Sequence, residues 1–244
     1  MKEIVYHTNY KLEETYWWFK ARNKIIVDLI RKYGKINEQE QILDVGCGTC
    51  GFAKSLSQYF SVVGLDTSPL ALEYCKKRGL NTLYLSLLKD LPKDELNIRM
   101  VTALDVIEHI EDDNDFVKDI YNVLPKDGTL FATVPAYKFL WSIHDEVHKH
   151  FRRYTKKDIV KIIENAGFEV QFSTYFNTFL FLPGLLKRLL DKYIKPVKNQ
   201  EFAIEILPKS INYIFQKVFE LEKYFIPNIP FPFGLSILVI AKKK

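Results

Sequence analysis

Residues 41–51 read QILDVGCGTCG, an apolar run that leads directly into three closely spaced glycines. Gly46, Gly48 and Gly51 fit the pattern G-x-G-x-x-G, in which glycine lets the backbone turn tightly and approach a ligand at the start of a helix. Asp66 follows twenty residues after Gly46, at the end of a second apolar run, SVVGL. Taken alone, this pattern predicts a strand–loop–helix unit that binds a dinucleotide.

Asp44 argues against a dinucleotide. It ends the first predicted strand two residues before Gly46, where its carboxylate would face a bound pyrophosphate. Two like charges about 4–6 Å apart in a partly buried site repel by kilocalories. S-adenosylmethionine carries a sulfonium and an ammonium instead, so Asp44 would favour it, directly or through an ordered water. Asp66 could accept hydrogen bonds from both ribose hydroxyls. Both aspartates could alternatively be turn or capping residues.

Strands and helices alternate along most of the chain, which predicts a mainly parallel sheet with helices on both faces. Helix signals include the terminating Gly34, the pair Ser68-Pro69 and a capping box at Thr155–Asp158. The expected strands are 41–45, 61–65, about 82–87, about 99–104, 128–134, 168–173 and 234–241. The expected helices are 12–33, one ending near 59, one opening at 68, about 112–123, and one from 155 to 167.

Three segments together resemble the class I S-adenosylmethionine-dependent methyltransferases: LDVGCGTCG (43–51), VVGLD (62–66) and TALDVIEHIEDD (102–113). The resemblance covers about residues 41–170. It implies a Rossmann-like seven-stranded sheet with an antiparallel last strand, S-adenosylmethionine as cofactor, and methyl transfer as the reaction. The chain departs from the family pattern at Cys50, where the third glycine is usual, and at Leu87, where many relatives have an aspartate.

The resemblance and the long stretch rich in Phe, Leu, Ile, Lys and Pro between the last two expected strands together divide the chain. Residues 1–40 would form an N-terminal helical lid, 41–173 the cofactor-binding core, 174–233 a helical insertion and 234–244 the final strand. In the lid, Arg22 would reach the methionine carboxylate, although Trp17 and Trp18 could simply pack on the core. Adenine recognition would fall to the backbone near Leu87 and Leu88, or to Asp90. The expected cofactor-binding residues are Trp18, Arg22, Asp44, Gly46, Cys47, Gly48, Asp66, Thr67, Leu87, Leu88, Asp105 and His109.

Asp105, Glu108 and His109 follow the fourth strand at a spacing that lets them converge on one helical turn. The segment is similar to that of the ubiquinone-pathway O-methyltransferases, in which an acidic pair and a histidine can hold a divalent ion. We nevertheless expect no metal here, and assign these residues to hydrogen bonding and packing beside the cofactor.

The segment PAYKFLWSIHDEVHKHFRRYT (135–155) follows the fifth strand and contains three of the five histidines. Loops at the carboxyl ends of parallel strands often contain binding and catalytic residues. Methylation of a hydroxyl needs a base, and a histidine with a near-neutral pKa suits that role. We expect His144, paired with Asp145, to be that base, with His148 and His150 next. Arg152 and Arg153 would bind an anionic acceptor or cap the sheet edge. The expected catalytic residues are His144, Asp145, His148, His150 and Tyr154.

Composition limits the location and the partners. The net charge of +5 comes from the end of the chain, where residues 183–244 contain eleven Lys/Arg and five Asp/Glu. Two amphipathic stretches in the insertion could rest on a membrane, pack over the active site or form a homodimer. Residues 178–186 are too short a run to span a bilayer, and the N-terminus has no apolar signal core. We expect a soluble cytoplasmic protein, with peripheral membrane contact left open.

Three cysteines do not suggest a disulfide scaffold, and we interpret the C-x-x-C of Cys47 and Cys50 as incidental rather than as a redox site. Nucleic acid is not an expected partner, because LDVIEH stands after the fourth strand, where base methylases have N/D-P-P-Y. The sequence therefore predicts a methyltransferase acting by O-methylation on a small-molecule, lipid or glycan acceptor. The alternatives are an NAD-dependent oxidoreductase and a non-catalytic S-adenosylmethionine-binding module.

Overall fold

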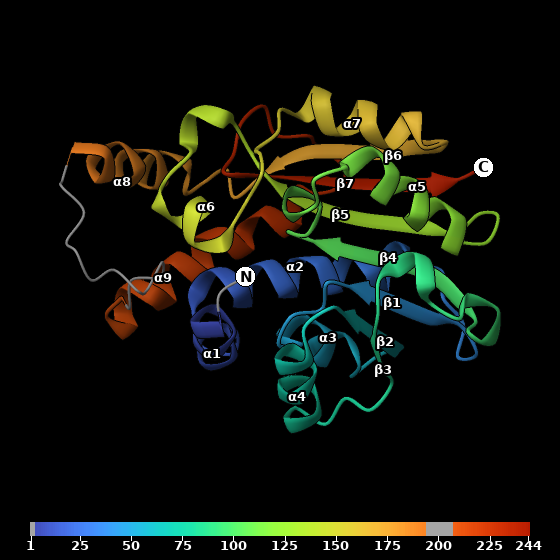
Figure 1. The fold of residues 1–244 in the computed structure, drawn as a ribbon. Coiled ribbons are helices and arrows are strands. Elements are labelled where there is room, and N and C mark those ends of the chain that lie inside the picture. The colour runs from blue at the N-terminus through green and yellow to red at the C-terminus, as the bar shows by residue number, and fades with distance from the viewer. Residues whose placement is uncertain (1–2, 194–206) are drawn as a thin grey trace.

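The computed structural model describes residues 3–193 and 207–244. Its seven strands form one sheet in the order β3-β2-β1-β4-β5-β7-β6 (Figure 1). β1 to β5 pair in parallel, and β7 runs antiparallel to both of its neighbours, which confirms the predicted Rossmann-like sheet. The strands are β1 (Gln41–Val45), β2 (Ser61–Asp66), β3 (Leu83–Leu85), β4 (Ile98–Leu104), β5 (Thr129–Pro135), β6 (Phe168–Phe176) and β7 (Ser236–Lys243).

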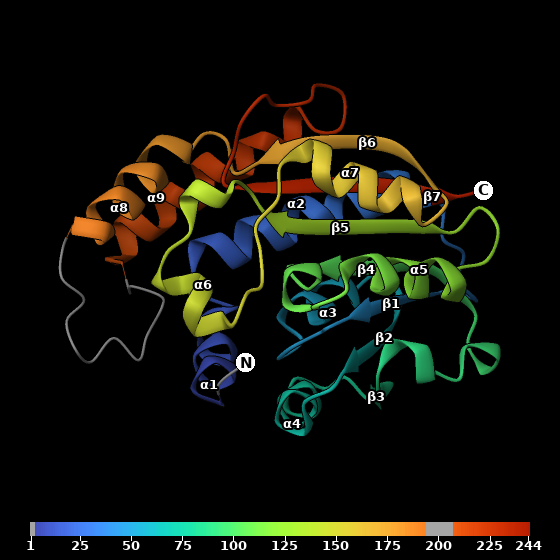
Figure 2. The same cartoon turned by 45° about the horizontal axis from the view of Figure 1, so that its top comes forward.

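Helices cover both faces of the sheet. α5 and α7 contact each other on one face, and α2 contacts α3 and α9 on the other (Figure 2). None of the described helices is both long and apolar enough to cross a membrane. The helices are α1 (Glu3–Leu12), α2 (Trp17–Tyr33), α3 (Gly51–Leu56), α4 (Pro69–Lys77), α5 (Asp113–Val123), α6 (Ile143–His148), α7 (Lys156–Asn165), α8 (Phe181–Tyr193) and α9 (Lys209–Glu220).

The direction of the strands decides where functional loops gather. Because β1, β4 and β5 are parallel, their carboxyl ends at Val45, Leu104 and Pro135 meet at one edge of the sheet. β7 is antiparallel and pairs Ser236 with Pro135, so it brings its amino end to the same edge. The loops after β1, β4 and β5 and the segment before β7 therefore lie together.

The helix predicted over residues 12–33 begins later than expected, and a separate helix that the sequence did not predict precedes it. α1 ends at Leu12, α2 begins at Trp17, and the residues between them form turns. Tertiary contacts hold the break, because Asn212 of α9 accepts a hydrogen bond from the backbone N–H of Trp17 at 2.9 Å. The ring of Trp17 also packs edge-on against Phe215, with centroids 5.6 Å apart. The predicted end of α2 at Gly34 is confirmed by a bond from its N–H to Ile30.

The insertion begins later than the sequence predicted. β6 continues to Phe176 and takes the first three residues of the expected helical segment into the sheet. α8 and α9 are helical as expected, whereas residues 194–206 of the predicted insertion lie outside the described residues. α9 packs against α2, which ties the insertion to the N-terminal part of the chain.

One cysteine pair in the structure was not predicted from the sequence. A disulfide joins Cys50, directly before α3, to Cys75 of α4, and Cys47 is a buried free thiol. Cys50 has a φ of 63°, the left-handed conformation that glycine favours. Cys50 stands where the family pattern has glycine, and its backbone adopts the left-handed conformation that glycine would adopt there.

Candidate active site

A cavity of about 610 Å³ opens at the carboxyl edge of the sheet and extends from the glycine loop to the segment around α6. It brings together eight of the expected cofactor residues and three of the expected catalytic ones. Those that line it are Trp18, Arg22, Asp44, Gly46, Cys47, Gly48, Asp105, His109, His144, His148 and His150. Asp66, Thr67, Leu87, Leu88, Asp145 and Tyr154 are not among the lining residues.

The glycine loop presents bare backbone to this cavity. At Gly46 the φ is +64°, and an added Cβ would lie 2.7 Å from a methyl group of Val106, so a side chain does not fit. Gly48 also has a positive φ, of +55°, but an added Cβ would meet no atom closer than 4.0 Å. The first glycine is therefore needed for packing between two loops, and the second leaves room for a ligand.

Asp66 fixes the loop to the tip of β2. Its Oδ2 accepts a hydrogen bond from the N–H of Gly48 and its Oδ1 accepts one from the N–H of Ser68, both at 2.9 Å. The side chain is buried, and burial raises the pKa of its carboxyl group above the ordinary value. Each oxygen keeps a second lone pair for a ligand hydroxyl.

Carboxyl groups surround the glycine-loop end of the cavity. Asp44 is 3% exposed and accepts a 2.7 Å hydrogen bond from Thr102. Burial raises the pKa of Asp44 to about 7. Asp105 pairs with the buried Arg22 at 2.5 Å, and the guanidinium of Arg22 lies 4.6 Å from the ring centroid of Trp18. Glu13 is the third carboxyl group that lines this end of the cavity, and carboxyl groups suit a ligand that carries positive charge.

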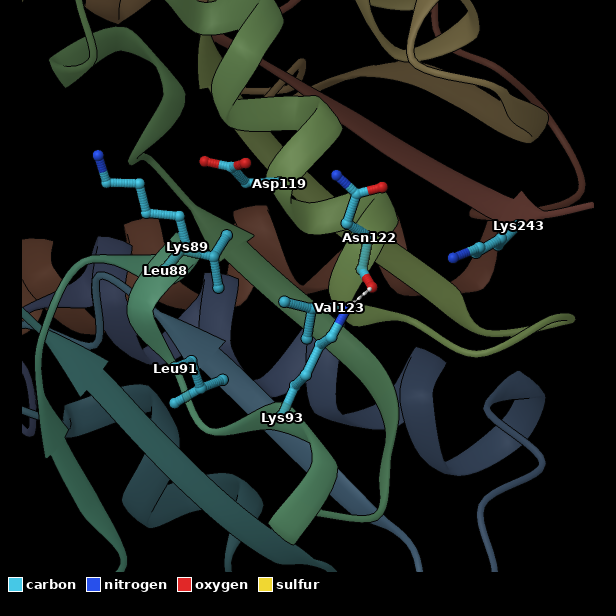
Figure 3. A pocket seen from close by; sticks show the side chains of 8 residues that line it. All are labelled: Leu88, Lys89, Leu91, Lys93, Asp119, Asn122, Val123 and Lys243. Carbon is cyan, nitrogen blue, oxygen red and sulfur yellow. Dashed lines mark hydrogen bonds between the residues drawn. The ribbon is translucent and has the colours of Figure 1, made fainter.

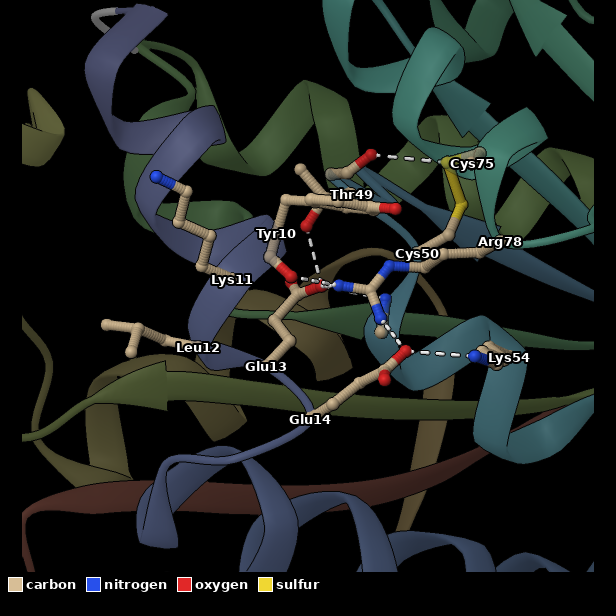
Figure 4. Close-up of polar contacts among 12 residues, drawn as sticks. Tyr10, Lys11, Leu12, Glu13, Glu14, Thr49, Cys50, Lys54, Cys75 and Arg78 are labelled. Carbon is tan, nitrogen blue, oxygen red and sulfur yellow. Dashed lines mark hydrogen bonds and ion pairs between the residues drawn. A yellow bond between two sulfur atoms is a disulfide. The ribbon is translucent and has the colours of Figure 1, made fainter.

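Hydrogen bonds and ion pairs hold the segment between α1 and α2 against the glycine loop (Figure 4). Glu13 Oε2 accepts hydrogen bonds from the N–H of Gly51 at 2.9 Å and the hydroxyl of Thr49 at 2.6 Å. Arg78 at the end of α4 donates to Glu13 at 3.1 Å and to Glu14 at 2.5 Å. The guanidinium of Arg78 is almost fully buried, so its ion pair with the buried Glu13 is shielded from solvent, whereas the side chain of Glu14 is half exposed. The break between the helices thus places a carboxylate against the glycine loop.

Four histidines meet at the other end of the cavity. His109 lies edge-on to His150 with ring centroids 4.6 Å apart, and His144 stacks on His148 at 4.1 Å. Burial lowers the pKa of His109 to about 3 and that of His148 to about 4. Burial also lowers the pKa of His144 well below its ordinary value. These three rings are therefore neutral near pH 7.

The expected pairing of His144 with Asp145 was wrong. Asp145 Oδ1 accepts hydrogen bonds from Nδ1 of His150 at 2.9 Å and from Nε of Arg153 at 2.8 Å, and Oδ2 accepts one from the N–H of Ser142 at 2.9 Å. Neighbouring residues on a helix point in different directions, so His144 and Asp145 of α6 do not face each other. Burial opposes ionisation of Asp145, but the bonds from His150 and Arg153 outweigh it and hold its pKa below the ordinary value.

Glu108 lies between these groups on the short 3-10 helix that follows β4. Its side chain is fully buried, and neither carboxylate oxygen has a hydrogen-bond partner in the described part of the chain. Its Oε1 lies 4.0 Å from Nε2 of His150. One ligand atom each from Glu108, His109 and His150 falls within 4.8 Å of the others, which is a spacing that could hold a metal ion.

Two expected site residues point elsewhere. The hydroxyl of Tyr154 donates to Asp113 at 2.9 Å in the protein interior, away from the cavity. Leu88 lines a separate hollow of about 320 Å³ between the segment after β3 and α5, where Lys93 donates to the backbone oxygen of Asn122 at 3.2 Å (Figure 3). Local sequence gave no sign of either placement.

Sequence reasoning missed several residues that line the cavity. Glu13, Asn177 and Arg188 come from the α1–α2 turn, the end of β6 and α8. Arg188 donates to the backbone oxygen of Leu140 at 2.9 Å and to the hydroxyl of Ser142 at 2.7 Å. No spacing motif marks these residues, because each reaches the site through a contact between distant segments.

Comparison with known proteins agrees with the fold and the site. A family model described as a methyltransferase domain matches residues 18–171. A ubiquinone biosynthesis O-methyltransferase from Rickettsia typhi is 27% identical over 186 residues, which cover 64% of this chain and 75% of the relative. A protein of the same name from Pelagibacter ubique is 28% identical over 129 residues, 48% of this chain and only about half (54%) of the relative.

The fold also matches a solved structure. The S-adenosylmethionine-dependent methyltransferase from Thermotoga maritima, described as a possible histamine N-methyltransferase, superposes with a TM-score of 0.58. The identity is 17%, and the match covers 99% of this chain and 98% of that one. With the family match over more than half of its length and the sheet order of the fold, the chain belongs to the class I S-adenosylmethionine-dependent methyltransferases.

Proposed function

We propose that this methyltransferase transfers the methyl group of S-adenosylmethionine to a hydroxyl of a small-molecule, lipid or glycan acceptor. The observation that carries the proposal is the single cavity of about 610 Å³ whose two ends differ in chemistry. One end has bare glycine backbone and carboxyl groups, and the other has four histidines. Methyl transfer needs a donor and an acceptor aligned in one space.

The glycine-loop end fits the cofactor. The sulfonium and ammonium of S-adenosylmethionine would lie near Asp44, Glu13 and Asp105, and its carboxylate would reach Arg22. Asp66 would accept the ribose hydroxyls, and Trp18 would cover the methionine part from α2. The adenine would fall near Thr67 and the backbone of Leu87 and Leu88. The pyrophosphate of NAD would meet three carboxyl groups here, which disfavours a dinucleotide.

The histidine end fits the acceptor. A hydroxyl must lose its proton during transfer, and a base works best when its pKa lies near the working pH. The low pKa values of His109, His144 and His148 make these rings weak bases. His150 is the best-oriented of the four, because Asp145 holds its Nδ1 while its Nε2 lies 4.0 Å from Oε1 of Glu108, which also lines the cavity. The names of the ubiquinone biosynthesis relatives also favour oxygen as the acceptor atom.

α8 supports a lipid acceptor. It contributes Gly184, Lys187 and Arg188 to the wall of the cavity. The same helix exposes three leucines four residues apart, with 71%, 59% and 49% of their surface in solvent, at positions Leu182, Leu186 and Leu190. An apolar stripe beside the cavity would let a cytoplasmic enzyme rest on a membrane and take its acceptor from it. The alternative is that the same three leucines form the interface of a homodimer.

Incubation with methyl-labelled S-adenosylmethionine and separate lipid, glycan and small-molecule extracts tests the acceptor. We expect label in the lipid extract, on a product that resists the mild acid and base that cleave esters. Asp66→Ala, which cannot hold the cofactor well, is the matched control and should transfer little label. Methyl label found on a nitrogen atom of the product would contradict the proposal. The absence of label from all three extracts, combined with calorimetric binding of NAD, would also contradict it. Any turnover would exclude a non-catalytic module.

Affinity for the cofactor should depend on pH through Asp44. The folded, unliganded protein holds a proton on this carboxyl group up to about pH 7, whereas a bound ammonium favours the ionised form. Affinity for S-adenosylhomocysteine should therefore fall about tenfold from pH 8 to pH 6. Calorimetry across this range measures it, and Asp44→Asn should show a flat profile with weaker binding at pH 8.

The same pKa shift has a stability counterpart. A carboxyl group whose pKa is raised on folding is protonated in the native state but ionised in the unfolded chain between about pH 4 and pH 7. Its contribution to stability therefore falls as pH rises through this window. Asp44→Asn should raise the melting temperature of the unliganded protein at pH 8 but not at pH 4.

A further inference from the structure

We infer that Cys47, Cys50 and Cys75 form a thiol–disulfide exchange site, through which a small dithiol that enters the cavity reduces the disulfide behind the glycine loop. Cys47 is the exchanging thiol, and the state of the disulfide sets how firmly the loop is held. The thiol chemistry is independent of the proposed acceptor. Only its effect on cofactor affinity rests on the proposed placement of S-adenosylmethionine at this loop.

The first observation is that a free thiol lies beside the disulfide. Cys47 Sγ is 3.9 Å from Cys75 Sγ, and the sulfurs of all three cysteines fall within 4.8 Å of one another. Disulfides exchange when a thiolate attacks one of their sulfurs and a mixed disulfide forms. The fold therefore places an attacking group next to the disulfide that joins Cys50 to Cys75.

The second observation is the difference in exposure among the three cysteines. Cys50 and Cys75 are 0% exposed, so a reductant in solvent does not reach their sulfurs in the folded protein. Cys47 is 8% exposed and lines the cavity of about 610 Å³, which neither of the other two does. A dithiol that enters the cavity therefore meets Cys47, and Cys47 connects the cavity to the disulfide.

The third observation is that Cys47 has room to move toward Cys75. Gly46 and Gly48 flank it with φ of +64° and +55°, and glycine tolerates the backbone changes that such a shift needs. Gly64 of β2 leaves space beside the thiol, because an added Cβ there would lie 3.2 Å from Cys47 Sγ. A disulfide bond is about 2.0 Å long, so the two sulfurs must approach each other by about 2 Å.

The exchange itself needs no electrons from outside. The Cys47 thiolate attacks Cys75, the bond between these two sulfurs forms, and the bond from Cys75 to Cys50 breaks. Cys50 leaves as a thiolate and takes up the proton that Cys47 released. A dithiol in the cavity then attacks the sulfur of Cys47, Cys75 leaves as a thiol, and the second thiol of the reductant displaces Cys47. The dithiol becomes a disulfide, and the protein gains two electrons and two protons as two thiols.

The surroundings of Cys47 make the exchange slow. Burial, together with the negative charges of Asp44, Asp66 and Glu13, raises the pKa of the Cys47 thiol well above its ordinary value. The thiolate is the attacking species, and it is therefore scarce near pH 7. Disulfide reshuffling takes seconds to hours in general, so we expect reduction of the folded protein at the slow end of this range.

The disulfide matters for the cofactor because it fixes the glycine loop to α4 (Figure 4). Cys50 ends the loop directly before α3, and Cys75 lies on α4. A second link is ionic: Arg78 donates to Glu13 at 3.1 Å, and Glu13 accepts a hydrogen bond from the N–H of Gly51 at 2.9 Å. Reduction leaves this ionic link and removes the covalent one, so a smaller fraction of the protein holds the loop ready for the cofactor.

The rate of reduction by dithiothreitol tests the site without any assay of activity. Protein oxidised with diamide is incubated with dithiothreitol in native buffer, free thiols are trapped by alkylation at intervals, and mass spectrometry counts them. The wild type should pass from one alkylated cysteine to three. Cys47→Ser should pass from none to two about tenfold more slowly, because the exchanging thiol is missing.

Two controls separate the role of Cys47 from general effects. In denaturant the disulfide of Cys47→Ser should be reduced as fast as that of the wild type, which shows that the bond itself is unchanged. Asp115→Ala, on the exposed start of α5, should be reduced at the wild-type rate in native buffer. The inference is overturned if the oxidised wild type has no disulfide between Cys50 and Cys75, or if native Cys47→Ser is reduced as fast as the wild type.

S-adenosylhomocysteine tests the link to the cofactor. At saturation it should slow reduction of the wild type about tenfold, because it covers Cys47 in the cavity. The variant Cys50→Ser/Cys75→Ser, which mimics the reduced state, should bind S-adenosylhomocysteine about three- to tenfold more weakly than the oxidised wild type. Equal affinity of the two would overturn the inferred hold on the loop. Slow reduction of Cys47→Ser without protection by S-adenosylhomocysteine would support the exchange site and contradict the proposed position of the cofactor.

Discussion

Replacing Asp66 with alanine is expected to weaken S-adenosylmethionine binding by roughly 10²–10⁴-fold. The carboxylate would lose two charge-assisted bonds to the ribose hydroxyls, at roughly 1.5–3 kcal/mol each. It would also release the N–H groups of Gly48 and Ser68, which it holds at 2.9 Å, and so loosen the loop that approaches the cofactor. Calorimetric titration with S-adenosylmethionine and S-adenosylhomocysteine measures the loss.

Asp66→Asn separates the two effects, because an amide keeps one acceptor oxygen and the shape of the side chain. Its affinity should lie between that of the wild type and that of the alanine variant. Asp115→Ala, on the exposed start of α5, is the matched control and should bind normally. Unchanged affinity in a folded Asp66→Ala protein would show that the cofactor does not reach the end of β2.

Replacing His150 with alanine should lower turnover by roughly 10²-fold or more and leave cofactor affinity within about threefold. General acid–base groups contribute about 10²–10⁴-fold to rate. His150 is the histidine that Asp145 orients, and it lies at the end of the cavity away from the glycine loop. Turnover is measured with the acceptor found in the extract assay, and affinity by calorimetry with S-adenosylhomocysteine.

His144→Ala should have the smaller effect, because His144 is not bonded to Asp145 and its pKa is far below the working range. His7→Ala, outside the cavity, should be neutral for turnover. A larger loss for His144 than for His150 would return the role of base to His144. Loss of cofactor binding in a folded His150 variant would mean that the two ends of the cavity are not divided as proposed.

The sequence alone was enough to predict that the glycine loop and Asp44 lie at one edge of the sheet, while their binding of the cofactor stays a prediction. The motif of Gly46 and Gly48, the acidic ends of β1 and β2, and the strand–helix alternation are local signals, since each depends on residues within one or two adjacent elements. A parallel sheet then brings the carboxyl ends of its strands to one edge without further information. The seven-stranded, mainly parallel sheet and its antiparallel last strand were predicted correctly through the family resemblance, whereas the order of the strands came only from the structure.

The acceptor half was decided only by tertiary structure. Asp145 is next to His144 in sequence but bonds His150, because α6 turns the two neighbours apart and the chain after it folds back. Glu13 meets the glycine loop across 36 residues of sequence, and Arg22 meets Asp105 across 83. Such pairings depend on how whole elements pack, and composition or spacing within one segment does not encode them. The unpartnered carboxylate of Glu108 is likewise a property of the folded interior, where burial removes the water that would otherwise solvate it.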